Sequence, residues 1–206
     1  MVIGVDFDNT IVRYDELFHR IAVERGLIPA TVPARKKAVR DFLRRHGQER
    51  EWTELQGQVY GPGMAEAQAF PGVLDFFTRA LKSGVPTYII SHKTAIPAVG
   101  PGYNLHQSAR DWLTAQGFFE RTRIGLSPDH VHFGTTRHEK LRFIRERGCT
   151  HFVDDLEETF LEKEFPADVV KILFGHHNRP KGLEDVTLAA DWAQVATYVF
   201  GNANQA

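Results

Sequence analysis

The sequence contains a single cysteine and no long apolar segment. Because Cys149 has no second cysteine to pair with, the disulfide-stapled domains of small secreted proteins are excluded. No run of about eighteen apolar residues occurs, so no membrane-spanning helix is expected. The chain also reaches Asp6 without the basic and apolar leader of a secreted protein. We therefore expect a cytoplasmic protein with no membrane partner.

The sequence also lacks a charge excess of either sign. It has 25 Lys plus Arg and 26 Asp plus Glu, a formal net charge of -1, so we expect no nucleic-acid partner. One basic segment, at positions 35–45, is interpreted as the solvated face of an amphipathic helix, with a phosphate-rich ligand as the alternative. Its basic residues are Arg35, Lys36, Lys37, Arg40, Arg44 and Arg45.

Four short apolar runs are each followed directly by polar residues. Continuous apolar runs are typical of strands buried on both faces, as in a parallel sheet covered by helices. The polar residues would then gather beyond the carboxyl ends of the strands, where such sheets bind ligands. The runs are Val2–Val5 before Asp6, Tyr88–Ile90 before Ser91, Phe152–Val153 before Asp154, and Val169–Phe174 before Gly175, His176 and His177.

Helical patterns lie between the apolar runs, each ending at a glycine. The patterns run from 74 to 81, from 109 to 113 and from 141 to 145, with Gly84, Gly117 and Gly148 as the stops. Strands that alternate with helices predict an α/β fold with a doubly wound parallel sheet.

Residues 14–69 do not follow this alternation, because they show helical patterns without a convincing strand. We therefore predict a small helical cap at 14–69, inserted after strand 1 of a core domain that comprises residues 1–13 and 70–206. Phe70-Pro71-Gly72 marks the return to the core. The three apolar stripes of the cap are Phe18, Ile21 and Ala22; Ala38, Phe42 and Leu43; and Trp52, Leu55 and Val59.

The predicted sheet brings four carboxylates together: Asp6, Asp8, Asp154 and Asp155. Two like charges at about 4 Å repel by roughly 4 kcal/mol at an effective dielectric constant of about 20. A divalent cation removes this repulsion. Ligands that are all oxygen favour a hard ion such as Mg²⁺ over zinc.

These residues support phosphoryl transfer once the cation is bound. A carboxylate is an established nucleophile toward phosphorus, which suits Asp6. Asp8 would protonate the leaving oxygen and later activate water. Ser91 would hydrogen-bond the phosphoryl oxygens, and Lys140 would offset their charge.

Asp6-Phe7-Asp8-Asn9-Thr10 after a buried strand resembles the first motif of the haloacid dehalogenase superfamily. Ser91, Lys140 and the pair Asp154-Asp155 resemble its second, third and fourth motifs, in the same order. The resemblance implies that Asp6 is the nucleophile and Asp8 the general acid-base. It also implies Asp6, the Asp8 carbonyl and Asp154 as metal ligands, with Asp155 binding directly or through water. Its dehalogenase branch lacks the second aspartate of the first motif, so Asp8 points to phosphate chemistry.

The long span between Ser91 and Lys140 contains a second candidate lysine, Lys93. We favour Lys140, because it begins a helix that leads into the fourth motif. We assign a substrate-binding role to four other residues beside the motifs, which are Asn9, Thr10, His92 and Lys93.

Alternative interpretations stay open. The histidines His130, His132, His176 and His177 admit a zinc site, although no cysteine or third clustered ligand accompanies them. Each motif residue could also be structural, as a helix cap or a surface lysine. For the whole chain we predict a phosphomonoester hydrolase acting on a small phosphorylated metabolite. The alternatives are a non-catalytic phosphate- and metal-binding module, and a nucleotidase or phosphomutase of the same superfamily.

Overall fold

The computed structural model describes residues 1–201. Six strands form one sheet in the order β5-β4-β1-β6-β7-β8, and every neighbouring pair is parallel. The α/β class and the parallel sheet predicted from the apolar runs are therefore confirmed. The strands are β1 Ile3–Val5, β4 Thr87–His92, β5 Val131–Gly134, β6 His151–Asp154, β7 Val170–Phe174 and β8 Thr187–Ala189.

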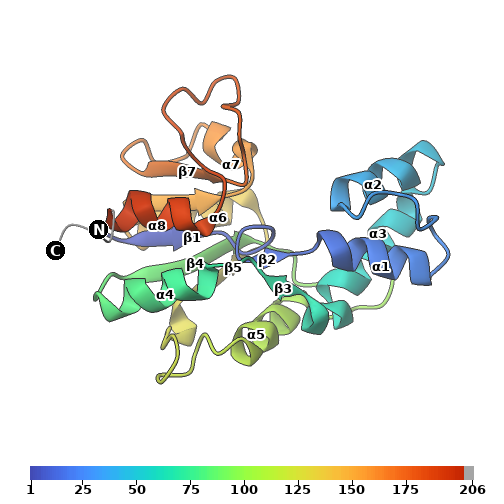
Figure 1. The fold of residues 1–206 in the computed structure, drawn as a ribbon, viewed down its shortest axis with the longest axis horizontal. Helices are drawn as coiled ribbons and strands as arrows, with labels where there is room; N and C mark the ends of the chain where they lie inside the picture. The colour runs from blue at the N-terminus through green and yellow to red at the C-terminus, as the bar shows by residue number, and fades with distance from the viewer. Residues whose placement is uncertain (202–206) are drawn as a thin grey trace. The chain divides into compact units, whose positions relative to one another are not determined.

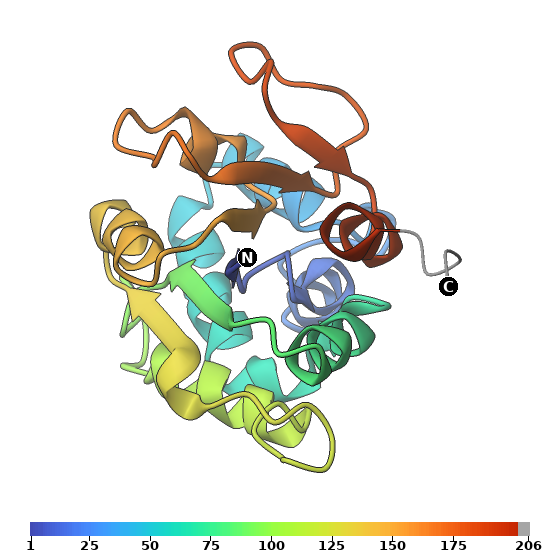
Figure 2. The ribbon, with the colours of Figure 1, turned by 90° about the vertical axis from the view of Figure 1, so that its left-hand side faces the viewer.

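Helices cover both faces of this sheet (Figures 1 and 2). Helices α4 (Val73–Lys82) and α8 (Trp192–Phe200) lie on one face, and α6 (Arg137–Glu146) lies on the other. Successive side chains of β7 point to opposite faces of the sheet. Leu173 packs into the cluster on the α6 side, while Phe174 contacts Trp192 of α8. The short helices η2 (Pro128–His130) and α7 (Glu157–Leu161) lie in the connections.

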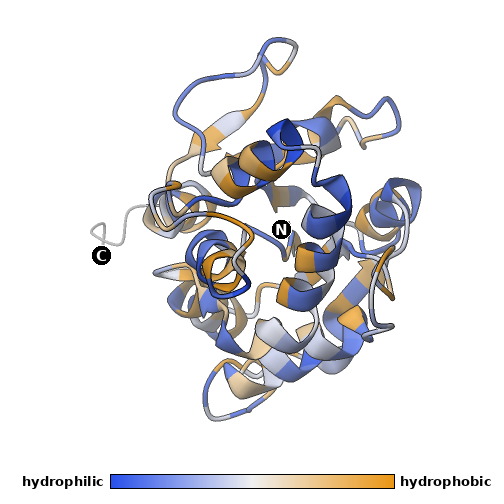
Figure 3. Cartoon of the chain, turned by 90° about the vertical axis from the view of Figure 1, so that its right-hand side faces the viewer, coloured by the Kyte–Doolittle hydropathy of each residue, from blue (hydrophilic) through white to orange (hydrophobic). Residues whose placement is uncertain are grey.

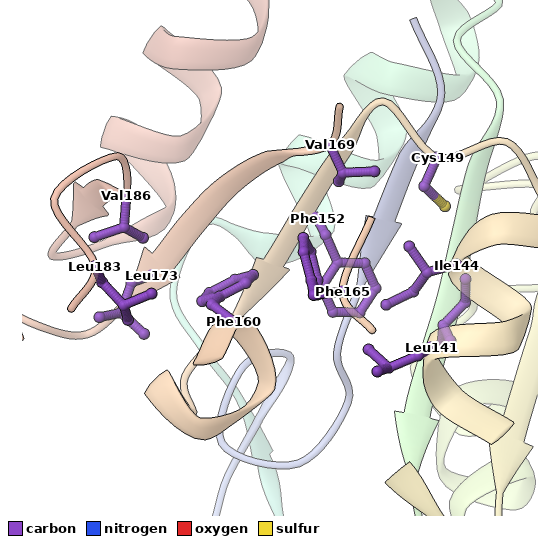
Figure 4. Close-up of a cluster of buried hydrophobic side chains, with 11 residues drawn as sticks. Leu141, Ile144, Cys149, Phe152, Phe160, Phe165, Val169, Leu173, Leu183 and Val186 are labelled. Atoms are coloured by element: carbon purple, nitrogen blue, oxygen red, sulfur yellow. The ribbon is translucent and has the colours of Figure 1, made fainter. Parts of the chain in front are cut away.

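The core on the α6 side is a cluster of buried side chains from α6, α7 and the central strands (Figure 4). Leu141 and Ile144 of α6 face Phe152 of β6 there, and they belong to the stripe predicted from the sequence. This packing holds α6 against the sheet and so fixes where Lys140 lies. The cluster comprises Ile90, Leu141, Ile144, Cys149, Phe152, Phe160, Phe165, Val169, Leu173, Leu183 and Val186.

The chain forms two compact units. Unit 1, which contains the six-stranded sheet, comprises residues 1–11, 69–92 and 117–201 of the described chain, and unit 2 comprises 12–68 and 93–116. The sequence predicts that residues 93–116 belong to the core, whereas the contacts group them with the inserted segment. Helix α5 (Leu105–Ala115) accounts for this, because Trp112 Nε1 donates to the Ala67 carbonyl at 2.8 Å. The function of this unit as a cap stays a prediction.

Unit 2 is otherwise built from α1 (Asp15–Glu24), α2 (Lys36–Arg45), α3 (Glu49–Tyr60) and η1 (Pro62–Glu66). The short strands β2 (Val12–Arg13) and β3 (Gln68–Ala69) pair with each other. The predicted stripes of α1 and α3 are buried. In α2 the predicted stripe is confirmed only at Leu43, because Ala38 and Phe42 are half-buried and Val39 is the second buried residue. Figure 3 shows both hydrophilic and hydrophobic residues along the helices, and in α2 the burial of Val39 and Leu43 fits the amphipathic helix predicted at 35–45.

Within the described part of the chain, no helix combines the length and the apolar character of a membrane span.

Candidate active site

Three adjacent strands deliver the first site residues to one edge of the sheet. Strand β1 lies between β4 and β6, with Val5 aligned to Ile89 and to Val153. Asp6 follows β1 directly, Ser91 lies near the end of β4, and Asp154 ends β6. The Asp6 backbone N–H donates to the Val153 carbonyl at 2.8 Å, which continues the β1–β6 pairing into the site. The predicted convergence at the carboxyl ends therefore occurs for these residues.

Helix α6 brings Lys140 to the same edge. Thr136 caps the helix by accepting a hydrogen bond from the Glu139 N–H, and Glu139 accepts one from the Thr135 N–H. Lys140 therefore lies in the first turn, as the sequence predicted. A Cβ at Gly134 would lie 3.0 Å from the Lys140 backbone nitrogen, so strand β5 approaches this turn closely.

The buried Lys140 ammonium bridges two carboxylates. It donates to Asp6 Oδ1 and to Asp154 Oδ2, both at 2.6 Å. The Ser91 hydroxyl donates to the same Asp6 Oδ1 at 2.8 Å. All four side chains are buried. A short charge-assisted bond in a dry site is strong, so this arrangement orients the Asp6 carboxylate.

The charges around Asp6 do not balance. Burial raises the pKa of the Asp6 carboxyl to about 7; Lys140 opposes this shift, and the charges of Asp154 and Asp8 add to it. Burial also disfavours the Lys140 ammonium, but the nearby charges of Asp154 and Asp6 outweigh it and raise the Lys140 pKa. Lys140 is therefore held as the cation, and the surplus of negative charge falls on the carboxylates.

Asp155 joins the cluster through the loop that follows β1. The Thr10 hydroxyl donates to Asp155 Oδ1 at 3.3 Å and accepts from the Asp155 N–H at 3.2 Å. Thr10 is fully buried, so its hydroxyl serves Asp155 in this structure, and its predicted substrate contact stays a prediction. Asn9 adopts a positive φ of 60°, alone among the non-glycine residues that are described, and this conformation turns the loop after Asp8.

Carboxylate oxygens of Asp6, Asp154 and Asp155 lie within 4.8 Å of one another. Oxygen donors in excess of the local positive charge suit a hard divalent cation, so the residues present fit the magnesium site expected from the sequence. Within the described chain, no histidine joins a group of this kind. His130 instead contacts the Thr87 carbonyl, and His132 accepts from Arg147, which leaves the zinc alternative without support.

The remaining predicted residues lie in both units. His92 contacts the Thr135 carbonyl through Nε2 at 3.2 Å, and burial lowers its pKa. Lys93 belongs to unit 2, where its buried ammonium lies 4.7 Å from the centre of the Tyr60 ring. Of the two candidate lysines, Lys140 is the one bonded to Asp6. The substrate-binding roles of Asn9, His92 and Lys93 stay predictions.

Two further residues contact this cluster of loops. Trp192 Nε1 donates to the Thr10 carbonyl at 3.0 Å, and His176 Nε2 lies 2.9 Å from the Asp155 carbonyl. His176 stands after a strand end, which is a signal for proximity to a site. Trp192 carries no such signal, because it is separated from Thr10 by 182 positions.

No protein-family model and no curated protein matches the chain. Solved structures do resemble it. A HAD family hydrolase from Deinococcus radiodurans R1, with bound phosphate and sodium, is 16% identical, with a TM-score of 0.60 over 96% of this chain and 94% of that one. A predicted phosphoglycolate phosphatase from Haemophilus somnus 129pt is 14% identical, with a TM-score of 0.56 over 96% and 97%.

An L-2-haloacid dehalogenase is also similar, at 13% identity and a TM-score of 0.52 over 96% of this chain and 97% of that one. A predicted phosphatase and a dehalogenase therefore both appear among the structural neighbours. At such low identity the likeness concerns the fold, and the fold agrees with the one implied by the four motifs. The chain thus adopts the fold of the haloacid dehalogenase (HAD) superfamily.

Proposed function

We propose that the protein is a Mg²⁺-dependent phosphomonoester hydrolase that acts on a small phosphorylated metabolite in the cytoplasm. The observation that carries the proposal is the set of contacts on Asp6. Ser91 and Lys140 both bond its Oδ1, and the carboxylates of Asp154 and Asp155 lie beside it. Among the described residues, none donates a hydrogen bond to Asp6 Oδ2, so this oxygen is the one available to attack phosphorus.

The cation would be held by the side chains of Asp6, Asp154 and Asp155 and by the backbone carbonyl of Asp8. It would neutralise the charge that otherwise keeps a carboxylate away from an anionic phosphate. The phosphate and sodium bound to the Deinococcus radiodurans structure support an ion and phosphate site in this fold.

The residues of the chain then account for two steps. Asp6 Oδ2 forms a bond to phosphorus as the ester P–O bond breaks, and the carboxyl group of Asp8 gives its proton to the leaving oxygen. In the second step the Asp8 carboxylate takes a proton from water, and the water oxygen bonds to phosphorus. The bond between phosphorus and Asp6 breaks, which releases inorganic phosphate. Ser91 and Lys140 stabilise the phosphoryl oxygens throughout.

Asp8 favours a phosphatase over a dehalogenase. It is half-buried, and its charge contributes to the raised pKa of Asp6, which places it within electrostatic reach of the nucleophile. The halide that leaves a haloalkanoate needs no proton, whereas the alkoxide that leaves a phosphate ester does. An acid-base aspartate beside the nucleophile therefore suits a phosphate ester.

Turnover of p-nitrophenyl phosphate can be measured by absorbance, with Mg²⁺ and with EDTA. We expect this turnover to depend on Mg²⁺ and to fall to background in Asp6→Asn, because the amide cannot act as the nucleophile. Asp8→Asn should lower kcat by about 10²–10⁴-fold, the usual contribution of a general acid-base. Asp168→Asn is the matched control, since Asp168 is exposed and outside the site, and it should retain full activity.

Undiminished activity in Asp6→Asn would overturn the role of the nucleophile. If turnover is absent under every condition while phosphate or Mg²⁺ still binds, the protein is the non-catalytic binding module instead. Where turnover is observed, a screen of sugar phosphates and nucleotides would identify the substrate class, and product analysis would separate hydrolysis from a phosphomutase reaction.

A further inference from the structure

Three polar atoms of Asp155 are engaged by residues outside the carboxylate cluster. The Thr10 hydroxyl contacts both its side-chain oxygen and its N–H, at 3.3 and 3.2 Å. Its carbonyl lies 2.9 Å from His176 Nε2. Because a carbonyl oxygen only accepts, Nε2 must carry the proton and His176 must be the donor. The conformation of Asp155 therefore depends on Thr10 and on His176.

Thr10 is in turn held by Trp192. The indole N–H of Trp192 donates to the Thr10 carbonyl at 3.0 Å, and both residues are almost completely buried. Trp192 cannot shift easily, because its ring packs against Phe76 at 4.8 Å and against Phe174 at 5.4 Å between centroids. The rigid core on this face of the sheet thus fixes one end of the loop that follows Asp6 and Asp8.

We infer that Trp192 and His176 are positioning residues for the divalent cation. They fix the conformation of Asp155, its ligand, and do not contact the cation themselves. The inference rests on the proposed function, since it deepens the cation site described there. Residues that orient metal ligands typically change metal affinity by about 10–100-fold when they are lost. The two residues act on the same ligand through separate bonds, one on the Thr10 loop and one on the Asp155 carbonyl.

The test is a Mg²⁺ titration of the full-length protein by its thermal midpoint, alongside turnover. Trp192→Phe keeps an aromatic ring and removes the donor, and His176→Phe removes the other donor. Each should raise the Mg²⁺ concentration for half-saturation by about 10-fold or more. Turnover at saturating Mg²⁺ should recover toward the wild-type kcat, because the reacting groups are intact.

Both variants have matched controls in the same chain. Trp112 is equally buried and donates to a backbone carbonyl, that of Ala67, but belongs to unit 2. Trp112→Phe should lower the thermal midpoint and leave the Mg²⁺ concentration for half-saturation unchanged. His177 is the exposed neighbour of His176, and His177→Phe should leave both quantities unchanged.

The outcomes separate this inference from the proposed function. If Trp192→Phe and His176→Phe, both folded, titrate with Mg²⁺ as the wild type does, the positioning role is wrong even where turnover is Mg²⁺-dependent. If the wild type binds Mg²⁺ more tightly than both variants yet hydrolyses no phosphate ester, the positioning role stands and the phosphatase proposal fails. A wild type with neither a Mg²⁺-dependent midpoint nor turnover would overturn both.

Discussion

At the scale of single residues, Lys140 is the group on which the buried charges depend. Its ammonium contacts Asp6 and Asp154, and both carboxylates are almost entirely shielded from water. A buried ion pair adds little to the stability of the folded state when compared with a well-packed apolar pair. Removing one partner is nevertheless destabilising, because it leaves an uncompensated buried charge. The lysine therefore supports the fold as well as the proposed chemistry.

We expect Lys140→Met to destabilise the protein by about 3–5 kcal/mol in EDTA at neutral pH, because Asp6 and Asp154 lose their shared cation. Urea unfolding measures this change. Lys171→Met is the matched control, since Lys171 pairs with the largely exposed Asp185, and it should cost only about 0–1 kcal/mol. Equal losses of stability in the two variants would contradict the role of Lys140 in offsetting the buried carboxylate charges.

At the scale of elements, the first turn of α6 sets the position of Lys140. Thr136 and Glu139 satisfy N–H groups at this helix end, and the close approach at Gly134 leaves the turn little room to move. The sequence already predicted a helix here from Leu141 and Ile144. The capping contacts appear only in the structure, because both Thr135 and Thr136 precede the helix and either could cap it.

Thr136→Ala is expected to destabilise the protein by about 1 kcal/mol, the usual cost of a lost N-cap. It should also reduce turnover of a phosphate ester, because Lys140 would no longer be held in place. Thr136→Ser keeps the hydroxyl and should restore most of both quantities. The denaturation midpoint and kcat are the measurements, and a Thr136→Ser variant as impaired as Thr136→Ala would argue against a capping role.

The strands show which elements a sequence pattern can detect. The four predicted strands are the four central ones, whose continuous apolar runs reflect burial on both faces. Within the six-stranded sheet, the two strands that the pattern did not indicate, β5 and β8, are the edge strands. Each has a single neighbour and half-buried residues, as in Val131–Gly134, so its sequence lacks the apolar run.

At the scale of the whole molecule, the reactivity of the Cys149 thiol depends on whether unit 1 is folded. It is the only cysteine of the chain and lies in the buried cluster beneath α6 (Figure 4). Burial raises the pKa of its thiol from 9.0 to about 12. The folded state therefore keeps its proton where the unfolded state loses it, so this group lowers stability as the pH rises above 9.

We expect iodoacetamide at pH 8 to label native Cys149 at least about 10³-fold more slowly than the urea-unfolded chain, because the thiolate is the reactive form. The raised pKa alone accounts for a factor of about 10³, and burial adds to it. Mass spectrometry follows the reaction, and Cys149→Ser gives the background. Rapid labelling of the native protein would show that the cluster around α6 is open.

The division into units is also a property of the whole molecule. The helical pattern at 109–113 occurs between two strands, where a crossover helix of the core is the ordinary interpretation. The structure instead packs α5 with the inserted segment, where Trp112 bonds to Ala67. Amphipathic spacing shows that a helix has a buried face, and it carries no information about which partner covers that face.

The sequence by itself determined the parallel sheet, its central strands and the acidic and hydroxyl residues at their ends, because these follow from local periodicity and from the common direction of the strands. Only the tertiary structure decided which groups bond to one another. Lys140 reaches Asp6 across 134 positions, Thr10 reaches Asp155 across 145, and Trp192 reaches Thr10 across 182. Such contacts depend on how helices pack on the sheet, and that packing arises from the whole buried core and not from any local pattern.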